Sequence, residues 1–102
     1  MDFPQYSLEQ VSMWNDQFLP DAWVGTQMDE HFCPLAQFVR SQLLAPCVVT
    51  VTGDYLGIDN RCYEDVPEWW AQVVHEVDGL EDVDGDGVVT AADFRLILAN
   101  QV

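Results

Sequence analysis

Residues 82–93 of the chain read Asp82-Val83-Asp84-Gly85-Asp86-Gly87-Val88-Val89-Thr90-Ala91-Ala92-Asp93. Acidic residues stand at the first, third, fifth and twelfth places of this stretch, and a glycine stands at the sixth place. Calcium binds about six to eight oxygen atoms in flexible geometry, and a loop that winds around the ion turns alternate side chains towards it. The spacing therefore predicts a calcium-binding loop that joins the third and fourth helices of the chain.

The predicted metal ligands follow from the place of each residue in the loop. The three acids at its start supply carboxylates, the seventh residue supplies its backbone carbonyl, and the hydroxyl at the ninth place binds directly or through water. The last acid closes the shell from the following helix. The predicted ligands are Asp82, Asp84, Asp86, Val88, Thr90 and Asp93. Gly87 is expected where the backbone turns sharply, because a side chain would obstruct that turn, and Val89 is expected to point away from the ion.

The same residues predict the start of the last helix. Thr90 and Asp93 have the T-x-x-D spacing of a capping box, and apolar residues follow at helical spacing. The alternative interpretation is an acidic turn that caps this helix and binds no metal. The filled ligand positions and the glycine favour calcium binding over that alternative.

These residues resemble a dockerin repeat, in which a D-x-D-G-D-G loop leads directly into a helix, and more distantly the EF-hand family. The resemblance covers residues 82–93 and implies the same ligand positions. Asp93 stands where the EF-hand has Glu, which implies weaker calcium binding or a changed selectivity against magnesium. Dockerins are secreted and carry two loops in tandem, whereas this chain has one loop. The remainder, including Cys33-Pro34-Leu35-Ala36 and Val66-Pro67-Glu68-Trp69-Trp70, is similar to small bacterial and phage proteins of uncharacterised function.

Hydrophobic periodicity outside the loop predicts three further helices. Each has a start signal, either the capping box Ser7-Leu8-Glu9-Gln10 or a proline in the first turn. These helices are expected over residues 7–18, from Pro34 to a point before Pro46, and over residues 67–78.

The intervening segments predict a small antiparallel sheet. Residues 20–31 show no clear period and are expected to form a surface connection. The β-branched run 47–52, followed by Gly53-Asp54, predicts a hairpin with a type II′ turn, and residues 61–64 are a candidate third strand. The expected architecture is a single α+β domain over residues 1–102, with the calcium loop and last helix at 82–100.

The charge of the chain limits its partners. It has 18 Asp and Glu against three Arg and no Lys, giving a formal net charge of −15. Nucleic acid and anionic membranes are therefore disfavoured as direct partners, whereas cations and proteins with a basic surface are favoured. No apolar run approaches the roughly 18 to 20 residues of a membrane span, and the N-terminal residues lack the pattern of a signal peptide. With three sparse cysteines, a cytoplasmic location is expected.

Three other groups of residues are candidate sites. His31, Cys33, Cys47 and Cys62 have the residue types of a zinc site without its close pairs. His75 beside Glu76 could suggest acid and base chemistry, but no nucleophile motif accompanies it, so no catalytic residue is predicted. Trp69 and Trp70 cannot both face one core, so one of them is a candidate anchor for a protein partner.

The sequence therefore predicts a non-enzymatic, acidic calcium-binding interaction protein whose single loop holds the C-terminal helix in place. The rival hypothesis is a protein, of phage or other origin, that imitates the phosphate array of DNA and inhibits a DNA- or RNA-binding protein. It rests on the acids outside the loop, whose presence calcium binding does not explain. A scaffold stabilised by zinc is a third possibility.

Overall fold

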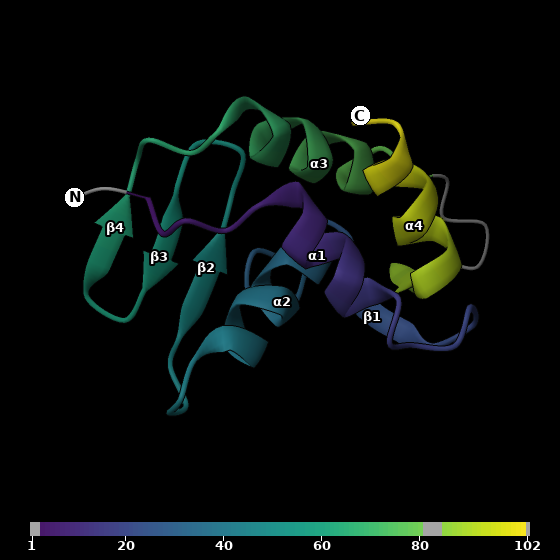
Figure 1. Ribbon diagram of the computed structural model, residues 1–102, viewed down its shortest axis with the longest axis horizontal. Helices are drawn as coiled ribbons and strands as arrows, with labels where there is room; N and C mark the ends of the chain where they lie inside the picture. The colour runs from purple at the N-terminus through teal and green to yellow at the C-terminus, as the bar shows by residue number, and fades with distance from the viewer. Residues whose placement is uncertain (1–2, 81–84, 102) are drawn as a thin grey trace.

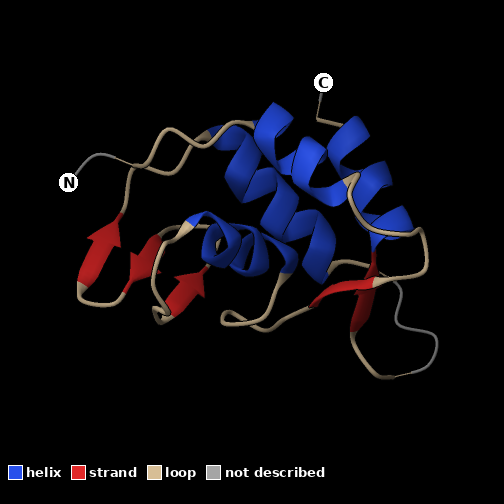
Figure 2. Cartoon of the chain, turned by 60° about the horizontal axis from the view of Figure 1, so that its bottom comes forward, coloured by secondary structure: helices blue, strands red, loops and turns tan. Residues whose placement is uncertain are grey.

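A computed structural model of the chain describes residues 3–80 and 85–101. It confirms the α+β class, with four helices and two small antiparallel sheets around one core (Figures 1 and 2). The elements in chain order are α1 (Leu8–Asn15), β1 (Trp23–Thr26), α2 (Pro34–Gln42), β2 (Val49–Val51), β3 (Leu56–Ile58), β4 (Arg61–Tyr63), α3 (Glu68–Asp78), β5 (Val88–Thr90) and α4 (Ala91–Ala99). No helix in the described ranges is long and apolar enough to cross a membrane.

Helix α1 begins as the sequence predicts. The Ser7 hydroxyl accepts a hydrogen bond from the Gln10 amide at 3.1 Å, and the Gln10 side chain accepts one from the Ser7 amide at 2.8 Å. This reciprocal pair satisfies two donors that a helix start would otherwise leave unpaired. The helix ends at Asn15 rather than at residue 18, because the chain continues there in tight turns.

The expectation that residues 20–31 form only a surface connection is wrong. Residues 23–26 form strand β1, which pairs antiparallel with β5. Trp23 lies opposite Thr90, and Gly25 lies opposite Val89, with an irregularity in the register between these two pairs. The chain thus contains the order helix, strand, helix twice, in α1–β1–α2 and α3–β5–α4, and the two strands join the two units.

The second sheet lies at the other end of the molecule from α4 (Figure 1). Its strand order is β2–β3–β4, so the predicted hairpin and third strand are confirmed. The predicted type II′ turn is wrong, because Gly53 does not have the positive φ that this turn requires. Instead, the Thr52 hydroxyl accepts hydrogen bonds from the amides of Asp54 and Tyr55, and this holds the turn.

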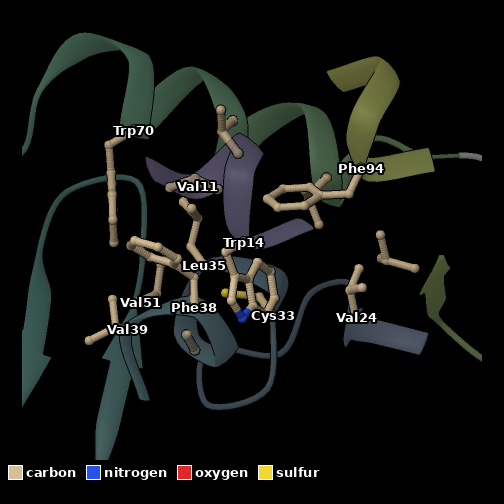
Figure 3. Packing of buried hydrophobic residues seen from close by; sticks show 14 of the residues in the cluster. Val11, Trp14, Val24, Cys33, Leu35, Phe38, Val39, Val51, Trp70 and Phe94 are labelled. Atoms are coloured by element: carbon tan, nitrogen blue, oxygen red, sulfur yellow. The ribbon is translucent and has the colours of Figure 1, made fainter. Parts of the chain in front are cut away.

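An aromatic cluster joins the helices inside the core. The Trp14 ring makes edge-to-face contacts with Phe18, Phe38 and Phe94, at centroid distances of 5.1, 5.9 and 6.5 Å. Such contacts are favourable beyond the burial of apolar area alone. In Figure 3, Trp14 lies between Phe38 of α2 and Val24 of β1. One tryptophan therefore fixes α1 against both α2 and α4.

Backbone carbonyls from a distant segment complete the start of α4. The amides of Ala91 and Ala92 donate to the carbonyls of Ala22 and Pro20, at 3.0 and 2.9 Å. The buried Asn15 side chain donates to the carbonyl of Ala91 at 2.9 Å. The first turn of α4 is thus held by the end of α1 and by the segment that leads into β1.

Candidate calcium loop

The described part of the predicted loop begins at Gly85. Gly85 and Gly87 have positive φ values of 72° and 70°, a conformation that residues with a side chain rarely adopt. A Cβ atom at Gly87 would also lie 3.2 Å from the Thr26 side chain. The expectation of a sharp turn at Gly87 is therefore confirmed.

Asp86 stabilises this turn through one of its carboxylate oxygens. Its Oδ1 atom accepts a hydrogen bond from the Val88 amide at 3.0 Å, and the side chain is exposed. Only one of the two carboxylate oxygens takes part in this bond. The other oxygen has the chemistry of a ligand for a hard cation.

Thr90 and Asp93 form the predicted capping box. The Thr90 hydroxyl accepts from the Asp93 amide at 3.2 Å, and Asp93 Oδ2 accepts from the Thr90 amide at 3.5 Å. Between the turn and the box, Val89 is fully buried in the core while Val88 is exposed. The side chain of Val89 therefore points into the core, and it anchors the loop there.

Gln27 connects the chain before the loop to the turn within the loop, a role that the sequence did not reveal. Its side-chain Nε2 lies 3.3, 3.2 and 3.0 Å from the carbonyl oxygens of Val77, Asp78 and Leu80, at the end of α3. Its backbone amide donates to the carbonyl of Gly87 at 2.8 Å. One residue of the segment after β1 thus holds the chain before the loop and the turn within it.

Asp82 and Asp84 lie outside the described residues, so the structure places four of the six predicted ligands. In residues 3–80 and 85–101, no group of three or more His, Cys, Asp or Glu side chains is arranged to hold a metal. The described ligands still suit calcium in kind, since Asp86, Thr90 and Asp93 offer hard oxygen atoms and Gly87 has the required backbone turn.

The candidate zinc residues are dispersed. All four are described, and no three of them belong to a group that could hold a metal. Cys33 is buried before α2, Cys62 is exposed on β4, and Cys47 is half-buried. His31 Nδ1 lies 3.2 Å from the carbonyl oxygen of Val49. Each of the four residues therefore lies in different surroundings, and they do not form a common zinc site.

Burial sets the chemistry of two of these cysteines. It raises the pKa of the Cys33 thiol from 9.0 to about 11, because desolvation disfavours the thiolate. The pKa of Cys47 is also raised, first by desolvation and then by the nearby Asp59 carboxylate. Both thiols are therefore protonated and unreactive as nucleophiles at neutral pH.

The adjacent tryptophans of α3 face different surroundings. Trp70 is fully buried, its indole donates to the Thr52 carbonyl at 3.3 Å, and its ring contacts Phe3. Trp69 is half-buried. The two rings contact each other edge to face at a centroid distance of 5.8 Å, but only Trp70 is fully buried, so the prediction that both cannot face one core is confirmed. Trp70 connects α3 to the β2–β3 turn. His75 is exposed on α3.

Comparison of the chain with protein-family models, with curated proteins and with solved structures gave no match.

Proposed function

We propose that this protein is a non-enzymatic, acidic calcium-binding interaction protein of the cytoplasm, and that its single EF-hand-like loop stabilises α4 against the core. Calcium is the proposed ion, and the proposed ligands are those derived from the sequence. The main support is the backbone of the described half of the loop. Gly87 has its positive φ, and Thr90 and Asp93 form their capping box.

The pairing of β5 with β1 supports a structural role for the ion. Unpaired hands of this kind often find a second strand by dimerising, whereas β5 already has an antiparallel partner in its own chain. The ion would hold the ligand side of the loop, while Val89 and Gln27 attach the loop to the rest of the fold. Calcium that binds only the folded state stabilises it by mass action, by about 2.7 kcal/mol at a hundred times the dissociation constant.

Calorimetry and thermal unfolding of the full chain in calcium test this proposal. We expect binding of one ion per chain and a rise in melting temperature. Asp93→Asn should keep the cap of α4, because an amide oxygen can also accept from the Thr90 amide, but it should weaken calcium binding because the charge is lost. Asp54→Asn, in the exposed turn between β2 and β3, is the matched control and should bind like the wild type.

Absence of both binding heat and thermal shift at millimolar calcium would overturn the proposal. Without calcium, Asp93→Ala should destabilise α4 only through the loss of the cap. Unfolding of this variant in calcium-free buffer therefore separates capping from metal binding. A dye that reports apolar surface then distinguishes the two versions of the role. Increased dye fluorescence on adding calcium indicates a regulatory loop, and unchanged fluorescence indicates a structural one.

The exposure of the acids supports a second proposal, which is the DNA-mimic hypothesis. None of the described Asp and Glu side chains is buried, so their charges face solvent or loop backbone. Such a surface suits a protein partner with a basic groove. The test is capture of a DNA- or RNA-binding protein from host lysate in a salt-sensitive complex that nucleic acid displaces. Persistence of the complex in the presence of excess nucleic acid would contradict mimicry.

A further inference from the structure

An open groove of about 480 Å³ lies between α1, β1 and α2, and none of the predicted calcium ligands lines it. Trp14, Phe18 and Trp23 contribute aromatic surface to its walls, and Trp23 is 49% exposed. Pockets of about 300 to 1,000 Å³ with apolar walls and a few polar groups are typical of small-molecule sites. The size and lining of this groove therefore suit a small molecule with an apolar body.

Arg40 gives the groove a charge opposite to that of the molecule. It is the single charged residue in the lining, although the chain carries 18 acids and only three arginines. Within the described ranges Arg40 forms no ion pair, whereas Arg95 pairs with Asp16 at 3.2 Å. An arginine that faces a groove without a carboxylate has unused hydrogen-bond donors there.

Neighbouring side chains hold the Arg40 guanidinium in place. Its Cζ atom lies 5.0 Å from the centroid of the Phe32 ring, and its Nη1 donates to Gln37 Oε1 at 2.9 Å. The ring and the amide fix the plane of the guanidinium before any ligand arrives. A prepositioned fork of this kind is suited to a carboxylate, which can accept two parallel hydrogen bonds.

A second donor belongs to the same lining. Trp14 is one of its residues, and within the described chain no hydrogen bond joins its indole nitrogen to an acceptor. The corresponding nitrogens of Trp23 and Trp70 both have acceptors. The groove thus combines apolar walls with the unused donors of Arg40, and no carboxylate lines it.

We propose that this groove binds small monocarboxylates with an aromatic or branched apolar body, with the carboxylate on Arg40 and the body against Trp14, Phe18 and Trp23. A polyanion is disfavoured, because the net charge of −15 repels a ligand in proportion to the negative charge that the ligand carries. The proposal is independent of calcium binding, because none of the predicted calcium ligands lines the groove.

The test compares 4-phenylbutyrate with 4-phenylbutyramide, which has the same body and no charge. Calorimetry on the full chain in calcium-free buffer should show that the acid binds at least about ten-fold more tightly than the amide, as a charge-assisted hydrogen bond predicts. Arg40→Gln should reduce the acid to the level of the amide. Trp23→Ser should weaken both compounds, because it removes one apolar wall.

Arg61→Gln is the matched control, since Arg61 is exposed on β4 and lines no part of the groove. It should bind both compounds like the wild type, and circular dichroism should show that every variant is folded. Equal affinity of the wild type for acid and amide, or a preference for the acid that survives in Arg40→Gln, would overturn the proposal. No binding of the acid at millimolar concentration would overturn it as well.

Discussion

At the scale of single residues, many acids have local structural roles that a count of charges does not show. Asp29 accepts from the amides of His31 and Phe32, Asp59 accepts from the Val48 amide, and Asp78 accepts from the Met28 amide. Carboxylates favour such positions because they accept strongly from backbone N–H groups in turns. Part of the acidic surplus therefore stabilises loops.

Cys33 should make stability fall in alkaline solution. Its folded pKa of about 11 is above the ordinary value of 9.0, so the folded state holds its proton longer than the unfolded state does. The contribution is complete below pH 9 and is lost as the pH rises through 11, about 2 to 3 kcal/mol in total. Urea unfolding from pH 8 to 11 measures this loss.

Cys33→Ala is the control for this titration. It should be less stable at every pH, because it leaves a cavity, but it should have a shallower decline above pH 9. Parallel declines in the two proteins would assign the alkaline effect to other groups, such as Tyr6, whose pKa is also raised by burial.

At the scale of elements, the loop depends on a segment that contains none of the predicted calcium ligands. Strand β1 pairs with β5, and the residues around it bind the end of α3, the turn at Gly87 and the start of α4. The sequence contains one acidic loop pattern, yet the fold places a second helix–strand–helix unit beside it.

Gln27→Ala should destabilise the protein by about 1 to 3 kcal/mol, because carbonyls at the end of α3 lose their donor. If the loop binds calcium, the affinity should fall as well, since the chain before the loop is less well held. Denaturant unfolding measures the first effect, and calorimetry measures the second. Gln72→Ala, exposed on α3, should leave both unchanged, and equal behaviour of the two variants would refute the role of Gln27.

Gly25→Ala should destabilise the fold by about 1 to 3 kcal/mol or more, as overpacking does. A Cβ atom there would lie 2.4 Å from the backbone nitrogen of Pro34 and 2.7 Å from the carbonyl carbon of Cys33. These are backbone atoms, so β1 must move away from α2. Thermal unfolding measures the change.

Gly53→Ala is the matched substitution for that experiment. No atom lies within 4 Å of a Cβ placed there, and φ is not in the left-handed region. Its melting temperature should therefore stay close to that of the wild type. A similar loss in both variants would mean that the close approach of β1 and α2 has no special cost.

At the scale of the whole molecule, repulsion among the acids opposes folding. A net charge of −15 on a compact chain destabilises it, and dissolved salt screens that repulsion over about 8 Å at physiological ionic strength. Raising the sodium chloride concentration from about 10 mM to about 200 mM should increase the melting temperature by a few degrees in calcium-free buffer. An unchanged or lower melting temperature would show that local carboxylate contacts outweigh the repulsion.

The sequence by itself determined the helices and their starts, as well as the hairpin of the second sheet. The boxes Ser7–Gln10 and Thr90–Asp93 join residues three apart, and the positive φ of Gly87 is a property of its own backbone. Such features follow from local chemistry, which a short stretch of sequence contains in full.

Only the tertiary structure decided what surrounds the loop and where the groove lies. Strand β1 has four residues, including a glycine, and pairs with a strand more than sixty positions away. Gln27 has its role because the end of α3 lies beside it, and Arg40 has its role because α1 and β1 meet α2 at the groove. These contacts have no local pattern, since they form only when the packing of Trp14 and its neighbours has fixed α1, α2 and α4 relative to one another.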